Sequence, residues 1–193
     1  RATAQLIASA TDPDGSLRDL TRLVQWTSLD PEIASIDARG RITPLSDGEA
    51  RIVASGGSVE AQATVRVERM AEPDPVSFRH DVIPALSQAS CNMGACHGTP
   101  TGKGGFRLSL RGYLPDEDYQ TLSREIAGRR VDPFDPDNSM LLRKPLGSLA
   151  HEGGVRLFRD TKSFEFLRDW IAEGVKDDPD SPAAVALEIV PGN

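Results

Sequence analysis

The sequence predicts two domains, an all-β sandwich followed by a mainly helical domain. The chain of 193 residues is long enough for two modules. Apolar and polar residues alternate with a period of two in the first part, whereas apolar residues recur at helical intervals in the second part. The composition changes near Pro73. We therefore expect domains at residues 1–70 and 78–176, a linker at 71–77, and a C-terminal linker or tail at 177–193.

Four stretches of the first domain have the pattern of half-buried strands. Successive side chains of a strand point to opposite faces, so the stretch 61–67 would turn alternate residues from Ala61 to Val67 toward a core. This pattern suits a two-sheet sandwich. The four stretches are residues 4–10, 23–26, 50–55 and 61–67, separated by turn-forming sequences at 12–15, 30–31 and 46–48.

The first domain resembles the bacterial Ig-like domain of group 2 over about residues 1–70. The resemblance lies in residues 24–37, 40–44 and 47–50, with the sequences VQWTSLDPEIASID, GRITP and DGEA. It implies a spacer or adhesion module. Trp26 is expected to be a core residue rather than a sugar-stacking platform. Asp12, Asp14 and Asp19 lack the glycine and glutamate of a calcium loop, so we expect solvated turn carboxylates.

Two helices are predicted around the middle of the second domain. The first spans residues 81–89, with Pro84 in its first turn, and leads to a cysteine. Asp116 is the candidate N-cap of the second, which ends at Gly128. Tyr119, Leu122 and Ile126 would lie on one face of that helix.

Two more helices are predicted toward the end of the second domain. A short one spans residues 138–143. The last would be capped by Thr161 or Ser163 and closed by Gly174. Its apolar stripe consists of Phe164, Leu167, Trp170 and Ile171.

The two cysteines of the chain lie in the sequence CNMGACH, which starts at Cys91. In c-type haem attachment, two thiols add to the porphyrin vinyl groups and the histidine after the second cysteine binds the iron. Cys91, Cys96 and His97 have this order, with four residues between the cysteines instead of the usual two. Small residues such as Gly94 would let the longer loop bulge. This pattern predicts one haem c per chain.

Two other readings of the cysteine motif stay open. In an oxidising compartment, Cys91 and Cys96 could form a disulfide that closes a small loop. The two thiols and His97 could also supply three of the four ligands of a zinc ion. The histidine directly after the second cysteine favours haem over the spread-out spacing of zinc ligands.

The second domain resembles the planctomycete-type cytochrome c domain from about Val76 to Gly174. The resemblance lies in the segments CNMGACHG (91–98), GKGGFRLSLRG (102–112), DPDNSMLLRKP (135–145), HEGG (151–154) and LRDWIAEG (167–174). It implies a class I-like cytochrome c fold and single-electron transfer with a redox partner protein or a neighbouring domain of a larger polypeptide. Because bacteria attach covalent haem outside the cytoplasm, it also implies a periplasmic or extracellular location.

Histidine and methionine are the usual sixth ligands of electron-transfer haems, which leaves His80, Met93, Met140 and His151 as candidates. Met93 lies within the tether and His80 precedes the motif-bearing helix, so both start on the proximal side. The resemblance implies His151 as the distal ligand, with Met140 or an open site as alternatives. Coordination by His97 and His151 would leave no vacancy for oxygen, which favours an electron carrier over a peroxidase-like enzyme.

The rest of the expected haem crevice consists of apolar and basic side chains. Phe106 and Leu108, with Leu110 and Leu141, are candidate walls. Arg107 or Arg143 would bind the haem propionates, because a guanidinium grips a carboxylate with two parallel hydrogen bonds. These two belong to a loose basic group that also includes Arg111, Arg129, Arg130 and Lys144.

Charge and hydropathy exclude other functions. The formal net charge is -7 at pH 7, and no stretch concentrates lysine and arginine, so we expect no nucleic-acid partner. No apolar run is long enough to cross a bilayer, and we expect no transmembrane segment. The histidines lack the context of a hydrolytic triad, which predicts that the chain is not a hydrolase.

Overall fold

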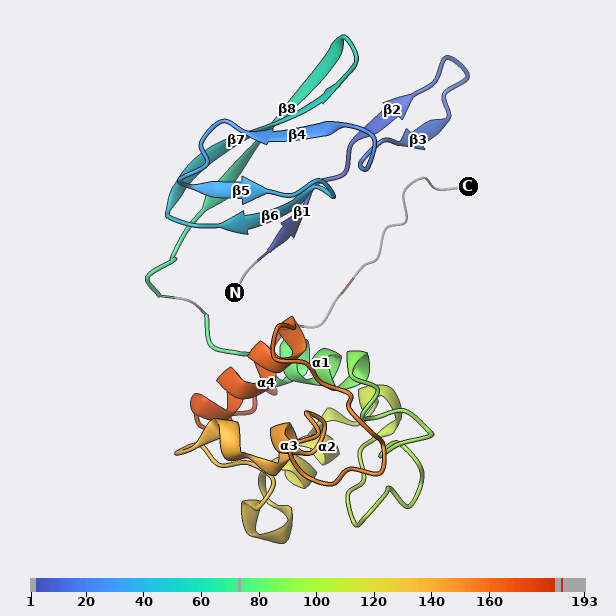
Figure 1. Ribbon diagram of the computed structural model, residues 1–193, viewed down its shortest axis with the longest axis vertical. Coiled ribbons are helices and arrows are strands. Elements are labelled where there is room, and N and C mark those ends of the chain that lie inside the picture. The colour runs from blue at the N-terminus through green and yellow to red at the C-terminus, as the bar shows by residue number, and fades with distance from the viewer. Residues whose placement is uncertain (1–2, 73, 183–184, 186–193) are drawn as a thin grey trace. The chain divides into compact units, whose positions relative to one another are not determined.

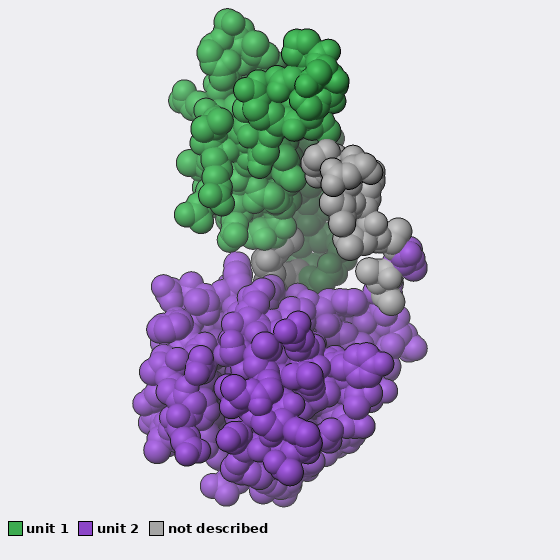
Figure 2. All heavy atoms as spheres, turned by 90° about the vertical axis from the view of Figure 1, so that its right-hand side faces the viewer, with its two compact units in different colours: residues 1–74, 187–193 green, residues 75–186 purple. Residues whose placement is uncertain are grey.

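The computed structural model describes residues 3–72, 74–182 and 185. The chain divides into two compact units, unit 1 up to Asp74 and unit 2 from Pro75 (Figures 1 and 2). The boundary falls inside the segment expected to be a linker. In the part of the chain that the structure describes, no helix is long and apolar enough to span a membrane.

Unit 1 is built from antiparallel strands in three small sheets (Figure 1). One sheet has the order β1-β6-β5, a second pairs β2 with β3, and a third has the order β4-β7-β8. The described strands are β1 (Ala4–Gln5), β2 (Ser9–Thr11), β3 (Leu17–Asp19), β4 (Gln25–Ser28), β5 (Ala34–Ile36), β6 (Arg41–Pro44), β7 (Gly48–Gly56) and β8 (Val59–Val67).

The core of unit 1 is small and apolar. β7 contributes Ala50 and Ile52, and β6 contributes Ile42 from another sheet. Val67 of β8 and Ala34 of β5 complete the buried cluster. Alternate residues of the long strands therefore point inward, as a sandwich requires.

The predictions for β7 and β8 are confirmed, since the stretches 50–55 and 61–67 both lie inside them. Ala63, Val65 and Val67 of β8 point inward as predicted, but Ala61 is exposed near the hairpin. Trp26 packs against the core, and its Nε1 donates a hydrogen bond to the Thr21 carbonyl at 2.8 Å. The structure agrees with the prediction that Trp26 is a core residue.

Two predicted strands of unit 1 were wrong in extent. The stretch 4–10 is divided into β1 and β2 because the chain changes partners between them, β1 pairing with β6 and β2 with β3. The stretch 23–26 begins as a turn, in which the Leu23 and Val24 amides donate to the Leu20 carbonyl. β4 therefore starts only at Gln25.

Unit 2 is mainly helical, with short helices joined by long irregular segments (Figure 1). Its α-helices are α1 (Ile83–Gln88), α2 (Pro115–Ser123), α3 (Met140–Arg143) and α4 (Lys162–Ala172). A π-helical turn, η1 (Phe78–Val82), leads into α1. Three short 3-10 helices are η2 (Leu110–Gly112), η3 (Glu125–Gly128) and η4 (Pro136–Asn138).

The core of unit 2 gathers around the aromatic side chain of Trp170 on α4. The Phe78 ring lies 5.3 Å from Trp170 and also 5.3 Å from Tyr119 of α2, measured between ring centroids. The indole Nε1 donates to the Lys176 carbonyl at 2.7 Å, so this buried donor is satisfied. α1, α2 and α4 thus share one core, which supports the segments between them.

The predicted cap of the last helix is confirmed. Thr161 precedes α4, and its Oγ1 accepts a hydrogen bond from the Phe164 amide at 3.3 Å. The predicted apolar stripe is buried. Gly174 follows the helix with a φ of +94°, a conformation that glycine adopts without strain.

The helix predicted from Asp116 to Gly128 was wrong at both ends. Pro115 is the first residue of α2, and Leu114 rather than Asp116 precedes it as the N-cap. The helix ends at Ser123, and Ile126 then adopts a left-handed conformation with a φ of 54°. Ile126 is consequently exposed instead of sharing a face with Leu122.

The two ends of unit 2 are fastened to each other. Ser77, expected in the linker, caps η1 and donates from its hydroxyl to the Asp178 carboxylate. Asp177 and Asp178 were assigned to the tail, yet Arg79 donates to both, through Nε to Asp177 at 3.3 Å and through its amide to Asp178 at 3.2 Å. Val76 is buried in the same core. Residues 76–77 and 177–178 therefore belong to the folded unit.

Candidate functional site

The cysteine loop begins where α1 ends. The Cys91 amide donates to the Leu86 carbonyl at 2.8 Å, which fixes the loop to the helix. At the far side of the loop, the His97 amide donates to the Cys91 carbonyl at 2.9 Å. The Met93 carbonyl accepts from the amides of Cys96 and Gly98 at 2.9 and 3.0 Å. These bonds close the loop and bring both cysteines and His97 together.

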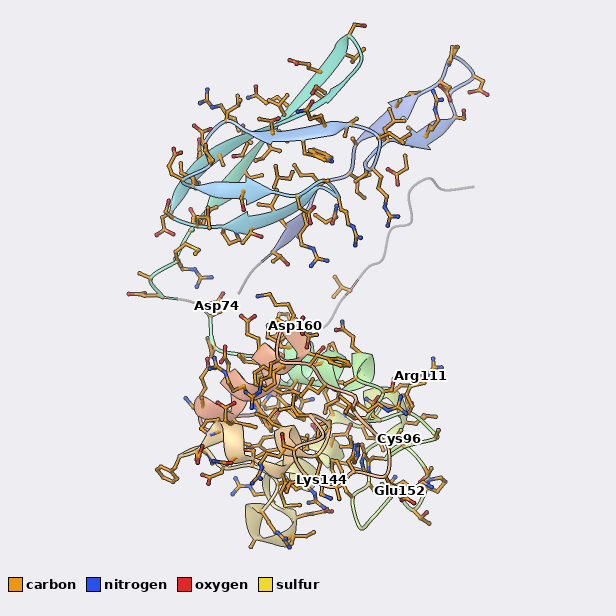
Figure 3. The ribbon with its side chains drawn as sticks, in the orientation of Figure 1. Asp74, Cys96, Arg111, Lys144, Glu152 and Asp160 are labelled. Atoms are coloured by element: carbon orange, nitrogen blue, oxygen red, sulfur yellow. The ribbon has the colours of Figure 1, made fainter. Side chains whose placement is uncertain are left out.

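Both cysteines are free thiols with partly buried side chains. Burial, together with the nearby Cys96, raises the pKa of the Cys91 thiol to about 11. Cys91 therefore stays protonated at neutral pH. Figure 3 labels Cys96 within this loop.

His97 is held by its neighbour Phe106. The Nδ1 atom of His97 lies 3.0 Å from the Phe106 carbonyl, and the two ring centroids are 4.4 Å apart. A carbonyl only accepts hydrogen bonds, so Nδ1 carries the proton. Burial lowers the pKa of His97 and keeps the ring neutral. Its Nε2 atom is therefore left with a lone pair.

His151 is held in a comparable way by a tight turn. Its Nδ1 lies 2.7 Å from the Gly154 carbonyl, while the Gly154 amide donates to the His151 carbonyl at 3.0 Å. A Cβ atom on Gly153 would lie 3.0 Å from Cε1 of His151, so the ring occupies space that a larger residue would restrict. The adjacent Glu152 is labelled in Figure 3. In the neutral ring, Nε2 is again the nitrogen with a free lone pair.

The structure brings the two imidazoles together. The ring centroids of His97 and His151 are 6.3 Å apart, and their planes differ by 18°. The two residues come from separate loops, one after α1 and the other after α3. This pairing is the main geometric feature of the candidate site.

The other candidate axial residues have different surroundings. His80 is exposed in η1, and its backbone amide donates to Ser77 at 2.9 Å. Met93 serves the cysteine loop through its carbonyl. Met140 is half-buried at the start of α3.

The predicted apolar walls differ in burial. Phe106 packs on His97, and Leu108 is buried with its amide donating to the His97 carbonyl at 2.9 Å. Leu141 is buried in the core of unit 2. Leu110 is half exposed and lies beside Gly94 of the cysteine loop. The chain turns into η2 at this residue, which leaves its side chain at the surface.

The two arginines predicted to bind propionates have different roles in the fold. Arg107 is exposed and pairs with Glu117 at 3.4 Å. Arg143 is half-buried at the end of α3, and its carbonyl accepts from the amides of Ser148 and Leu149 at 2.9 and 3.2 Å. Through these bonds the Arg143 backbone supports the loop that leads to His151.

Sequence reasoning gave no individual role to three residues around the site. Arg130 is buried, with its guanidinium 4.7 Å from the centroid of the Phe106 ring. Arg156 donates from Nε to the Gly153 carbonyl at 2.8 Å and ties down the turn of His151. Asn92 is buried inside the cysteine loop. The position of Asn92 between the cysteines was a visible signal, whereas the burial of Arg130 depends on tertiary structure.

The Asn92 side chain uses only part of its bonding capacity. Its Nδ2 donates to the Ser87 hydroxyl at 2.8 Å, but its buried Oδ1 has no hydrogen-bond partner among the described residues. A buried acceptor without a partner is energetically costly. No cluster of three or more His, Cys, Asp or Glu side chains suited to a metal ion occurs in residues 3–72, 74–182 and 185.

Comparison with known families bears on unit 1. Residues 3–67 match the model of the Bacterial Ig-like domain (group 2). This match agrees with the strands of unit 1 and confirms the resemblance predicted for that part of the chain. No curated protein matches the chain. The family match ends before the cysteine loop and does not cover unit 2.

Proposed function

We propose that unit 2 is a monohaem c-type cytochrome module that transfers single electrons outside the cytoplasm. Cys91 and Cys96 would hold the haem covalently, with His97 as the proximal ligand and His151 as the distal ligand. The observation that carries this proposal is the pair of imidazoles of His97 and His151, whose ring centroids lie 6.3 Å apart and whose planes are nearly parallel.

The distance between the rings fits two ligands of one metal ion. A nitrogen of an imidazole binds a transition metal at about 2 Å, and the ring centre lies further from the metal than that nitrogen. Two imidazoles on opposite sides of one iron are therefore separated by about 6 Å between centroids. The value for His97 and His151 agrees with this requirement.

The hydrogen bonds of the two rings fit the same role. Metal-binding histidines usually donate their second ring nitrogen to a carbonyl or carboxylate, which fixes the tautomer and the orientation of the ring. His97 does so toward Phe106, and His151 does so toward Gly154. Each ring is thereby left with Nε2 as the free ligand atom. A surface histidine with a purely structural role needs no such arrangement.

The cysteine loop fits covalent attachment. The bonds of the Met93 carbonyl and the contact between the His97 amide and the Cys91 carbonyl keep both thiols close to the proximal imidazole. The exposed Gly94 and Ala95 lie in the bulge that the longer spacing requires. Neither sulfur is engaged in a disulfide.

The chain residues favour an electron carrier over an enzyme. A bound haem supplies a one-electron couple between ferric and ferrous iron. His97 and His151 would occupy both axial positions, which leaves no site for oxygen or peroxide. Two imidazoles also give a lower potential than one imidazole with a methionine. Phe106 and Leu108 would exclude water from the proximal side.

Both units support the proposed location and partners. Bacterial Ig-like domains are typical of surface and extracellular proteins, and unit 1 belongs to that type. Covalent haem attachment in bacteria takes place in the same environment. The proposed partner is therefore a redox protein, or a neighbouring redox domain of a larger polypeptide.

The visible absorption spectrum tests the proposal. Full-length protein, matured in a host that attaches c-type haem, should have the spectrum of a low-spin six-coordinate haem. His151→Ala should convert it to a high-spin spectrum while the haem stays attached, because one axial ligand is lost. His80→Ala removes an exposed histidine and should leave the spectrum unchanged.

Other outcomes would assign other functions. A colourless wild-type protein would overturn the proposal. A high-spin wild-type spectrum would favour a peroxidase-like site with an open distal position. Conversion to high spin by Met140→Ala, and not by His151→Ala, would assign the distal position to the methionine instead.

A further inference from the structure

We propose that Arg130 raises the reduction potential of the iron bound at His97. Arg130 is a positioning residue with a permanent positive charge, and it acts through Phe106. The inference rests on the proposed haem function and adds a residue that sets the redox behaviour of the site. The observation behind it is that the Arg130 cation is buried close to the proposed proximal ligand, His97. Arg130 has only 7 % of its surface exposed.

The guanidinium of Arg130 is fixed by backbone carbonyls. Its Nη1 donates to the Thr121 carbonyl at 2.7 Å, and its Nη2 donates to the Gly105 carbonyl at 3.0 Å. Arginine stays protonated in proteins, so these bonds hold a full positive charge in place. They also join the end of α2 to the turn that carries Phe106.

Phe106 connects this charge to the proximal imidazole. The guanidinium carbon lies 4.7 Å from the centroid of the Phe106 ring, within the range of a cation–π contact. The same ring lies 4.4 Å from the His97 ring, and the Phe106 carbonyl accepts from His97 Nδ1. Arg130, Phe106 and His97 therefore form a continuous chain of contacts whose last member carries the ligand atom.

Glu125 offsets part of the charge. Its carboxylate lies 3.3 Å from Nη1 of Arg130, but its side chain is half exposed, with 52 % of its surface accessible. Water screens an exposed carboxylate more than a buried guanidinium. The net field of the Arg130–Glu125 pair at His97 is therefore positive. A positive field stabilises ferrous over ferric iron and favours the uptake of one electron from the reduced partner.

The test is a potentiometric titration of the holoprotein with redox mediators. Arg130→Gln removes the charge and should lower the equilibrium constant for reduction about tenfold, which is about 59 mV for one electron. Arg130→Lys keeps the charge and should retain most of the wild-type value. Glu125→Gln removes the opposing charge and should raise the constant severalfold. Arg159→Gln, an exposed arginine paired with Asp137, is the matched control and should have no effect.

The outcomes separate this inference from the proposed function. A wild-type protein without haem contradicts the proposed function itself. A haem-containing Arg130→Gln protein with the low-spin spectrum and an unchanged potential overturns only the role of Arg130. If Arg130→Gln does not fold, Glu125→Gln decides, and an unchanged potential in that variant overturns the inference. An equal fall in Arg130→Lys and Arg130→Gln also overturns it, because the charge would then not be the cause.

Discussion

Unit 1 and unit 2 use their irregular segments in different ways. In unit 1, the loops are short and their carboxylates serve turns, as in the hydrogen bonds of Asp14 with Ser16 and of Asp19 with Thr21. In unit 2, a long segment without regular strands runs from α1 to α2 and carries the cysteines and His97. The loops of the first unit complete a fold, whereas those of the second carry the cysteines and histidines of the candidate site.

Unit 2 holds the side chains of the candidate site in place without a sheet. The backbone of each loop is fixed by a few specific bonds, such as those that the Met93 and Arg143 carbonyls accept. The core of Phe78, Trp170 and the surrounding aliphatic residues provides a firm base for those loops. Because loops with fixed backbones have little freedom, the imidazoles of His97 and His151 would need little reorganisation to bind the proposed iron.

The largest effect is expected from removing the central side chain of the core of unit 2. Trp170→Ala should lower the free energy of unfolding of unit 2 by about 3–5 kcal/mol, because a large buried side chain leaves a cavity. Urea unfolding of the full chain should then have an earlier transition for unit 2 and an unchanged one for unit 1. Tyr113→Ala removes an exposed aromatic and is the control. A shift of both transitions would mean that the units do not unfold independently.

The reciprocal change tests the smaller core. Ile52→Ala in β7 should destabilise unit 1 by about 2–5 kcal/mol, since Ile52 is buried between the sheets. The visible spectrum of the haem-bound protein should not change, because the proposed site lies in unit 2. Ile7→Ala removes an exposed isoleucine and should cost far less. Loss of haem binding in Ile52→Ala would contradict the independence of the two units.

A smaller effect is expected at the start of α4. Thr161→Ala removes the acceptor for the Phe164 amide and should cost about 1 kcal/mol of unit 2 stability. Thr101→Ala, at an exposed turn position, is the matched control. Thermal unfolding measures both variants, and equal stability of the two would show that the cap contributes nothing.

The smallest expected effect depends on pH and concerns unit 1. The side chain and backbone of Arg51 donate to Asp30 and lower the pKa of its carboxyl to about 2. A depressed pKa in the folded state means that Asp30 contributes stability above its ordinary pKa of 3.8 and loses that contribution as the pH falls through about 2. The stabilities of wild type and Asp30→Asn should therefore converge at low pH. A difference that stays constant down to about pH 2 would contradict this.

Predictions from the sequence were most accurate where the structure depends on residues close together in the chain. Alternation along β8 placed Val67 in the core, and the pattern around Thr161 predicted the cap of α4. Predictions failed where pairing with a strand distant in the chain determines the structure. The strand predicted at residues 4–10 is divided because its two halves pair with β6 and β3.

The candidate site was predictable only in part. The spacing of Cys91, Cys96 and His97 is a local signal, whereas resemblance to a family pointed to His151. Hydrogen bonds from the rings to the carbonyls of Phe106 and Gly154 depend on loop conformation, which no periodicity encodes. The burial of Arg130 likewise follows from the way α2 meets the Phe106 turn.

Covalent haem on the cysteine loop is the central claim, and intact mass spectrometry tests it most directly. Protein matured with haem-attachment machinery should have the mass of the chain plus one haem after denaturation, and Cys91→Ala with Cys96→Ala should have the mass of the chain alone. A wild-type mass that lacks the haem, whether with free thiols, a disulfide or a zinc ion, would contradict the account.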